Sequence, residues 1–584
     1  MSISSKKVAL AFATTLPLYS VIGASVAQEA VQPEATHAVV EKQSVKSQKF
    51  MVASANPIAT QAGYEVLERG GSAADAAVAV QLMLNLVEPQ SSGIGGGAFM
   101  VYWDAKAKSL TTFDGREKAP MAATPDYWLG TDGQPVGWFD AVVGGRSVGV
   151  PGTLKLIETV HQRYGNQDWA ELIEPTRALA QGGFQISHRM ANSIANAVGK
   201  RKLEAMPHTR AYFFDKNGEP LKEGTLLRNP KFAAALAMIQ KEGSKAFYEG
   251  QIAKDIVEAV KTEENGGILT LEDMKAYSVV ERKPACAPYR GYEVCGMGPP
   301  SSGALTVGQI LSILSNYDIP AMGPGAESTH LYLEAAKLAY ADRGLYMADS
   351  DFVKMPEGLL DQSYLKERSA LIDPAKTMGK ADAGTPPWKE ASIYAPDTQL
   401  ERPGTSHFSI VDADGNVISM TTTIETGFGS RVMSNGFLLN NELTDFSRAP
   451  EKDGKPIANR VEGGKRPRSS MAPTIVLKDG KPVLAIGSPG GSRIINYVAQ
   501  SVIGILDFGM DPQVAISQPH IVNRNGATDV EEGTDAVAMV PALEAMGHEV
   551  NVRDLNSGLH VIQILDGELV GGADTRREGT VMGD

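Results

Sequence analysis

The sequence predicts an α+β fold, with helices before antiparallel strands. Apolar residues recur at helical spacing in several segments before residue 350, and three Asp-Gly hairpin signals follow residue 405. The regular strand–helix alternation of a parallel sheet is absent. Length alone, 584 residues, is enough for about three or four domains. No break in composition marks a boundary, which leaves one large unit open.

The N-terminus has the three parts of a secretory signal peptide. Lys6 and Lys7 precede an apolar run at 8–23, and small residues follow at 24–27. We therefore expect 1–27 to be removed and the mature chain to be secreted, into the periplasm. A buried N-terminal helix is the alternative. No later apolar run approaches the ~20 residues that span a bilayer, and no cysteine follows the run, so no membrane anchor is expected.

The next part of the chain is predominantly helical. The polar, irregular segment 28–50 is expected to be a mobile leader. Ser72 and Asp75 form a capping box at the start of one helix. Strands are expected at 98–104 and 109–114, after a glycine-rich loop. Helical spacing predicts helices at 57–69, 72–87, 151–164, 169–181, within 229–262 and at 326–347.

The last third has the pattern of an antiparallel sheet. The Pro-rich segment 384–404 is expected to be an exposed linker. A helix is expected at about 492–507. Paired runs of strand-forming residues flank tight turns, which predicts hairpins from 406–412 with 417–423, 474–477 with 482–486, and 560–565 with 568–571.

Cys286 and Cys295 are the chain's two cysteines. If Arg290 and Gly291 form a two-residue hairpin turn, counting outward sets the cysteines opposite each other in a non-hydrogen-bonded pair. The Cα separation of such a pair suits a disulfide, and an exported protein would oxidise it. Two separate buried thiols are the alternative; we favour the disulfide.

The context of several familiar signatures argues against the functions that they usually indicate. The glycine loop at 93–98 follows a helix and precedes a strand, which is the wrong order for dinucleotide binding. Ser147 lies in a G-x-S-x-G motif, but the βαβ alternation of that hydrolase fold is absent. The nine histidines have no metal-ligand spacing, so neither a metal nor another cofactor is predicted. The net charge of −13 argues against nucleic acid as a partner.

Thr405 begins a strand directly after Gly404. A threonine hydroxyl needs a base, and an α-amine with a pKa of about 7.7–8.0 can serve. That amine exists on Thr405 only if the bond after Gly404 is cut. By pattern alone an ordinary exposed Gly-Thr is the default interpretation.

The surrounding motifs change that interpretation. Residues 404–416 resemble the start of the small subunit of bacterial γ-glutamyltranspeptidases (glutathione hydrolases), which are N-terminal nucleophile hydrolases. The resemblance spans about 50–580. It continues through the motifs at 421–429, 439–446, 465–474 and 487–493, and upstream at 92–97, 114–117, 151–153 and 299–303.

The resemblance implies roles for individual residues. Thr405 matches the processing residue and nucleophile, Thr423 a threonine that contacts it, and Thr421 one implicated in maturation. Gly490 and Gly491 match backbone donors to the oxyanion. Arg116, Ser469 and Ser470 match residues that bind the donor's α-carboxylate, and the positions that face its α-amino group are Glu425, Glu442 and Asp445.

The resemblance also implies the fold and the products. We expect a four-layer αββα sandwich, two antiparallel sheets between helical layers, cut into a large subunit, 28–404, and a small subunit, 405–584. The two would stay together as a heterodimer. Glutathione or another γ-glutamyl compound would be the donor, and water, an amino acid or a dipeptide would accept the acyl group.

The sequence departs from the family in two places, and rivals stay open. Position 425 is often Asn and 442 often Gln in the family, but both are Glu here. The segment 447–468 has no aromatic residue, so a tyrosine-bearing lid is in doubt. A cephalosporin or glutaryl acylase on the same fold is the nearest rival, although Asp445 argues against it. A Ser147 hydrolase and a non-enzymatic exported binding protein are the others.

Overall fold

The computed structural model describes residues 1, 36, 39–262, 264–389, 393–397 and 399–584. The chain divides into residues 1–32 and residues 33–584, and every element below belongs to the second unit. The predicted signal peptide lies outside the described residues, apart from Met1. Within the described residues, no helix is long and apolar enough to cross a membrane.

The described residues form two large antiparallel sheets. The first has the strand order β1-β22-β21-β17-β16-β9-β8 and the second the order β23-β2-β10-β11-β3-β4-β7. The strands of the first sheet are β1 (Val45–Ser47), β8 (Ala285–Tyr289), β9 (Tyr292–Gly296), β16 (Thr474–Lys478), β17 (Lys481–Gly487), β21 (His560–Leu565) and β22 (Glu568–Ala573). Those of the second are β2 (Met51–Ser54), β3 (Gly97–Asp104), β4 (Ser109–Gly115), β7 (Val280–Arg282), β10 (Thr405–Val411), β11 (Val417–Thr423) and β23 (Thr580–Gly583).

The two sheets contact each other through their central strands. Strands β10 and β11 of the second sheet contact β17 of the first, and β10 also contacts β21. A shared cluster of apolar side chains includes Met51, Val411, Ile475 and Ile562. The core between the sheets is therefore built from strands far apart in the sequence.

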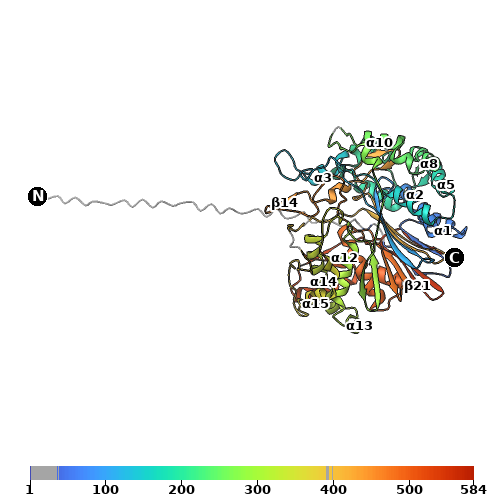
Figure 1. Cartoon of the computed structure of the whole chain (residues 1–584). Coiled ribbons are helices and arrows are strands. Elements are labelled where there is room, and N and C mark those ends of the chain that lie inside the picture. Colours follow the sequence, from blue (N-terminus) through green and yellow to red (C-terminus); the bar gives the residue numbers. More distant parts are fainter. Residues whose placement is uncertain (2–35, 37–38, 263, 390–392, 398) are drawn as a thin grey trace. The chain divides into compact units, whose positions relative to one another are not determined.

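Helices pack on the other faces of the sheets. Phe408 and Ile418 of the second sheet belong to one core cluster with α1, α2, α4, α5 and α8, and Val476 and Ile486 of the first belong to another with α12, α14 and α16. In Figure 1, α2, α5, α8 and α10 gather in one group and α12, α14 and α15 in another. The longer helices are α1 (Pro57–Glu68), α2 (Ala73–Val87), α4 (Thr153–Tyr164), α5 (Trp169–Gly182), α6 (His188–Asn196), α8 (Pro230–Glu242), α10 (Gln251–Ala259), α12 (Gly303–Leu314), α14 (Ala326–Tyr346), α15 (Gln362–Ser369) and α16 (Ile494–Leu506).

Short elements complete the unit. The smaller sheets are formed by β5 (Phe184–Gln185) with β6 (Leu226–Leu227), β12 (Met433–Ser434) with β13 (Phe437–Leu438), β14 (Glu451–Lys452) with β15 (Lys455–Pro456), and β18 (Ile521–Asn523), β19 (Thr528–Glu531) and β20 (Val550–Arg553). The short helices are α3 (Trp138–Val142), α7 (Pro207–Phe213), α9 (Lys245–Tyr248), α11 (Leu271–Lys275), α13 (Ile319–Met322), α17 (Pro512–Ser517) and α18 (Val540–Ala545).

Local sequence explains where several elements begin. Asn56 accepts a hydrogen bond from the Ile58 N–H and precedes Pro57, which starts α1. Ser72 and Asp75 form the predicted capping box of α2. In the β8–β9 hairpin Cys286 and Cys295 are register partners, and a disulfide joins them.

Two predictions about irregular segments were wrong. The expected mobile leader 28–50 contains β1, which pairs with β22, because its alternating side chains can join a sheet edge. The expected exposed linker 384–404 is partly buried at Asp397 and Glu401. Their charges are matched by buried arginines from elsewhere in the chain, which local composition does not reveal.

Candidate active site

Thr405 and Thr423 are direct partners at one end of the central β10–β11 pair. Because side chains alternate along a strand, Thr405 shares a face with Val411, which packs between the two sheets, while Phe408 faces the helices. Both threonines are buried. The two hydroxyl groups therefore meet at the end of the space between the sheets.

The peptide bond between Gly404 and Thr405 lies beside these two hydroxyl groups. The Thr423 hydroxyl donates a hydrogen bond of 2.8 Å to the Gly404 carbonyl oxygen. Its oxygen lies 3.4 Å from the Thr405 hydroxyl oxygen and accepts from the Glu425 N–H. A hydrogen-bonded carbonyl beside a buried hydroxyl is suited to attack by that hydroxyl.

Gly404 adopts a backbone conformation that favours glycine. Its φ is +157°, and a Cβ atom here would lie 2.1 Å from the Glu425 carbonyl oxygen. The small residue before Thr405 is therefore required by close backbone packing.

Gly490 and Gly491 lie at the turn between β17 and α16. Gly490 has φ +135° and Gly491 has φ +59°, and a Cβ on Gly491 would lie 2.6 Å from the Arg402 carbonyl carbon. A side chain at 491 would thus displace the segment that leads to Gly404. Backbone N–H groups at the start of a helix suit an anionic oxygen.

One small cavity, of about 20 Å³, brings most of the predicted residues together. It is lined by Arg116, Thr405, Thr423, Glu425, Glu442, Asp445, Ser469, Ser470 and Gly491, together with Glu401, Arg402, Met471 and Ile494. Of the predicted site residues, Gly490 and Thr421 are not part of this lining. The Thr421 hydroxyl instead contacts His407 Nδ1 at 2.9 Å.

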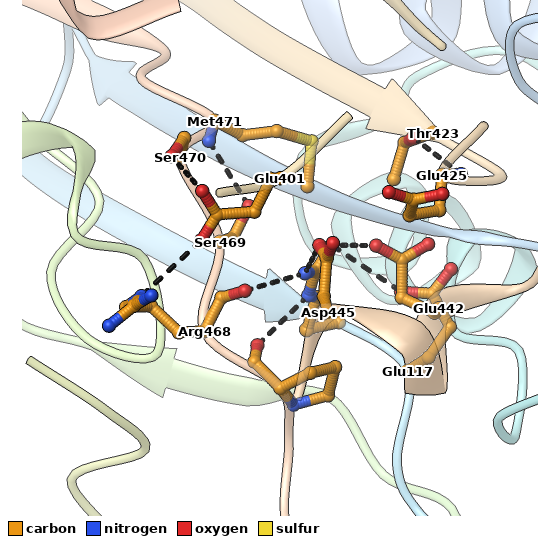
Figure 2. A network of polar contacts seen from close by, with 12 residues as sticks. Glu117, Glu401, Thr423, Glu425, Glu442, Asp445, Arg468, Ser469, Ser470 and Met471 are labelled. Atoms are coloured by element: carbon orange, nitrogen blue, oxygen red, sulfur yellow. Dashed lines mark hydrogen bonds and ion pairs between the residues drawn. The ribbon is translucent and has the colours of Figure 1, made fainter. Parts of the chain in front are cut away.

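Arg116 is engaged by the acidic side chains of the cavity. Its guanidinium forms ion pairs with Glu442 and Asp445, the latter at 2.6 Å. It also donates to the Pro467 and Arg468 carbonyl oxygens at 3.2 and 3.0 Å. Figure 2 shows Asp445, Glu442 and Glu117 close together around this contact.

Several buried carboxyl groups share this one guanidinium. Burial raises the pKa of Asp445 to about 8, against the opposing effect of Arg116, and raises the pKa of Glu117 to about 7. Burial also raises the pKa values of Glu425 and Glu442 well above normal. A cation placed among these groups would favour their ionised forms.

The two serines lie beside a second charged group, the Glu401 carboxylate. Ser470 Oγ donates to Glu401 at 3.0 Å, while Ser469 Oγ accepts from the Met471 N–H. Glu401 also pairs with Arg343 and Arg468. Burial alone would raise the pKa of Glu401, but these two guanidinium groups outweigh it and lower the pKa to about 2.

Sequence reasoning missed Glu401, Arg343 and Arg468 as parts of the site. Arg468 lies inside the 465–474 motif, so the motif could have drawn attention to it. Arg343 is on α14, 58 positions from Glu401, and no spacing rule links them. Arg577, which donates to the Thr405 carbonyl oxygen at 3.3 Å, was also missed.

Two other candidate sites, a serine nucleophile and a metal-binding group, have side chains that already contact other protein groups. Ser147 is buried, and its hydroxyl donates to the Val142 carbonyl oxygen at 2.6 Å, so it is not presented as a nucleophile. Among the described residues, one group could hold a metal ion: His330, Glu334 and His548. There the two imidazoles contact each other at 2.7 Å, and Lys337 already pairs with Glu334.

A family model described as Gamma-glutamyltranspeptidase matches residues 59–584. The chain belongs to the γ-glutamyltranspeptidase family. It is 39% identical to the glutathione hydrolase proenzyme of Bacillus subtilis (strain 168) over 546 residues, 91% of each chain. It is 38% identical to that of Escherichia coli (strain K12) over 547 residues, again 91% of each.

A solved structure supports the same fold. The crystal structure of cephalosporin acylase from Bacillus halodurans matches with a TM-score of 0.82 and 26% identity, over 95% of this chain and 99% of that one. The predicted resemblance and α+β class are therefore confirmed, and this γ-glutamyltranspeptidase-family chain is an enzyme.

Proposed function

We propose that the chain is an autoprocessed γ-glutamyl hydrolase and transferase with Thr405 as its nucleophile, acting on glutathione and related donors. The observation that carries this is the contact among the Thr405 hydroxyl, the Thr423 hydroxyl and the Gly404 carbonyl oxygen. Family membership and the glutathione hydrolase relatives support the substrate class.

Maturation begins with attack of the Thr405 hydroxyl on the Gly404 carbonyl carbon. The C–N bond breaks, the threonine nitrogen takes a proton and becomes an amine, and Gly404 is left as an ester on the hydroxyl oxygen. Water then hydrolyses the ester and releases Thr405 with a free amine and a free hydroxyl. Thr423 stabilises the developing oxyanion, and Thr421 supports this stage through His407. The products are subunits 28–404 and 405–584.

The two subunits stay bound as a heterodimer because they share both sheets. In the second sheet β2 of the large subunit lies between β23 and β10 of the small one, and β11 of the small subunit pairs with β3 of the large one. With helices on both outer faces, the unit is the four-layer αββα sandwich of N-terminal nucleophile hydrolases. Residues 1–27 act as the signal peptide, and the enzyme is exported to the periplasm.

Turnover uses the new amine as the base. The neutral Thr405 amine takes the hydroxyl proton as the oxygen attacks the donor's γ-carbonyl, and the N–H groups of Gly490 and Gly491 stabilise the oxyanion. The leaving amine receives the proton, and a γ-glutamyl ester remains on Thr405. Water, an amino acid or a dipeptide then takes the acyl group and restores the hydroxyl.

The rest of the cavity holds the amino-acid end of the donor. Ser469, Ser470 and Arg116 bind the α-carboxylate, and Glu425, Glu442 and Asp445 bind the α-ammonium. Three acidic side chains in one small cavity favour a donor with a positive charge. A glutaryl group carries none, which ranks the acylase function second despite the similarity to a cephalosporin acylase.

The test combines processing with activity. The purified wild-type protein is expected to give two bands on a denaturing gel, with Thr405 as a new N-terminus, and to hydrolyse γ-glutamyl-p-nitroanilide. Thr405→Ala is expected to give one inactive chain, while Thr405→Ser keeps some of both activities. A different new N-terminus, or an active uncut Thr405→Ala protein, would refute the assignment.

A further inference from the structure

The segment just before β1 is fastened to the loop between β22 and β23, residues 574–579. The Val40 N–H donates a hydrogen bond to the Thr575 carbonyl oxygen at 2.9 Å. The Lys42 ammonium donates to three more carbonyl oxygens of the same loop, those of Asp574 at 2.6 Å, Arg577 at 2.7 Å and Gly579 at 2.6 Å. Because an ammonium group has three N–H donors, Lys42 uses its full capacity on this loop.

This arrangement suits a lysine in particular. The Lys42 side chain is partly buried, and the hydration that its ammonium loses there is offset by the charge-assisted hydrogen bonds. An apolar side chain could pack in the same place, but it would leave the three carbonyl oxygens without this donor. Lys46, four residues further on in β1, is a contrast, because it is exposed and pairs with Glu568 at 3.1 Å.

The loop that Lys42 holds carries Arg577, which reaches the nucleophile residue. Arg577 is buried, and its Nε donates to Asn556 Oδ1 at 2.9 Å and to the Ser557 carbonyl oxygen at 2.6 Å. Its Nη1 donates to the Thr405 carbonyl oxygen at 3.3 Å. Since Lys42 binds the carbonyl oxygen of this same arginine, a short chain of contacts leads from the N-terminal segment to Thr405.

Cutting after Gly404 makes such contacts more important. In the uncut chain the peptide bond to Gly404 restrains Thr405 from one side. Once that bond is broken, Thr405 is an end residue, held by its pairing with Thr423 in β11 and by Arg577 at its carbonyl oxygen. The rate of attack depends steeply on where the nucleophile lies, and a misplacement of about 1 Å can cost roughly 100-fold.

Lys42 and Arg577 are not among the residues that line the cavity beside Thr405. We propose that Lys42 is a positioning residue: through the 574–579 loop it fixes Arg577, and Arg577 fixes the backbone of Thr405 for attack. The inference rests on the proposed function and adds no contact with the donor. Removal of Lys42 should therefore lower kcat and leave KM unchanged.

A double-mutant cycle tests whether Lys42 acts through Arg577. The variants are Lys42→Met, Arg577→Met and the two combined, and Lys46→Met serves as the matched control from the same segment. The measured quantities are kcat and KM for γ-glutamyl-p-nitroanilide, per mole of protein that has Thr405 as a new N-terminus. The assays run well below the thermal midpoint of each variant, so that loss of folded protein does not count as loss of rate.

For Lys42→Met, kcat is expected to fall about 5- to 30-fold, with KM within about twofold of wild type. Arg577→Met is expected to lose at least as much. In the Arg577→Met background, removal of Lys42 is expected to cost less than about twofold more, because the contact that it supports is already gone. Lys46→Met is expected to keep kcat and KM within about twofold of wild type, as an exposed side chain should.

The proposal would be overturned by an unchanged kcat in Lys42→Met, by a loss that appears in KM instead of kcat, or by losses that multiply in the double variant. If Arg577→Met does not mature, Arg577→Lys takes its place in the cycle. If neither matures, Lys42→Met alone decides by its kcat and KM. Failure of the proposed function looks different, because the wild type would then not hydrolyse γ-glutamyl-p-nitroanilide at all.

Discussion

Replacing Asp445 by Asn tests whether the cavity recognises the donor's amine. The change keeps the shape of the side chain and removes its charge. Asp445 is buried and pairs with Arg116 at 2.6 Å. Loss of one partner of a buried charge pair typically costs about 2–5 kcal/mol. Because Glu425 and Glu442 remain in the cavity, we expect the lower part of this range, about 2–3 kcal/mol, or roughly 30- to 150-fold in kcat/KM.

The assay measures kcat/KM for γ-glutamyl- and glutaryl-p-nitroanilide with wild type and Asp445→Asn. The glutaryl donor lacks the amine and is expected to lose less than about threefold, or to gain. Cutting after Gly404 should proceed normally, because Asp445 contacts neither Thr405 nor Thr423. Equal losses on both donors would refute the reasoning and assign Asp445 a purely structural role.

Three further predictions follow from the same geometry. Gly404→Ala should slow cutting at least about tenfold in a gel time course, because a Cβ would lie 2.1 Å from a carbonyl oxygen; cutting at the wild-type rate would contradict this. Cys286 and Cys295 should resist alkylation in the native protein and also after unfolding without reductant, and Cys286→Ser with Cys295→Ser should cost about 2 kcal/mol or a little more in the free energy of unfolding. Labelling of both thiols in the unfolded protein would exclude the disulfide. The pKa of Asp445 is raised to about 8, so below that pH the donor's ammonium must displace a proton from this carboxyl group. KM for the γ-glutamyl donor should therefore fall as the pH rises from about 6 to 8, by up to about tenfold per pH unit. A glutaryl donor should show no such slope, and the same slope for both donors would point to another group.

Helix starts and hairpin turns that depend on residues close together in the sequence could be predicted. The capping box at Ser72 starts α2, and the Asp-Gly turn after Leu565 joins β21 to β22. Each of these two signals depends only on residues that lie within four positions of one another. The count across Arg290 and Gly291 likewise gives the register of β8 and β9, and both turn residues have positive φ as a tight hairpin requires.

The elements set by distant partners could not be predicted. The four residues of β2, Met51–Ser54, form a strand because β10 and β23 lie on its two sides, and those partners are hundreds of positions away. The site divides in the same way. Motifs located most of the residues that line the cavity, but not Glu401, whose ion pair with Arg343 joins residues 58 positions apart in the sequence.

The second sheet combines strands from before and after Gly404, which has a consequence for how this protein is made. If the chain is cut after Gly404 as proposed, each of the two large sheets contains strands from both fragments, so separating the fragments disrupts both sheets. A folding reaction that was unimolecular becomes bimolecular, and refolding from denaturant should depend on concentration and give poor yields. The heterodimer would then form by folding of the uncut chain followed by cleavage. The separated fragments would not reassemble it efficiently.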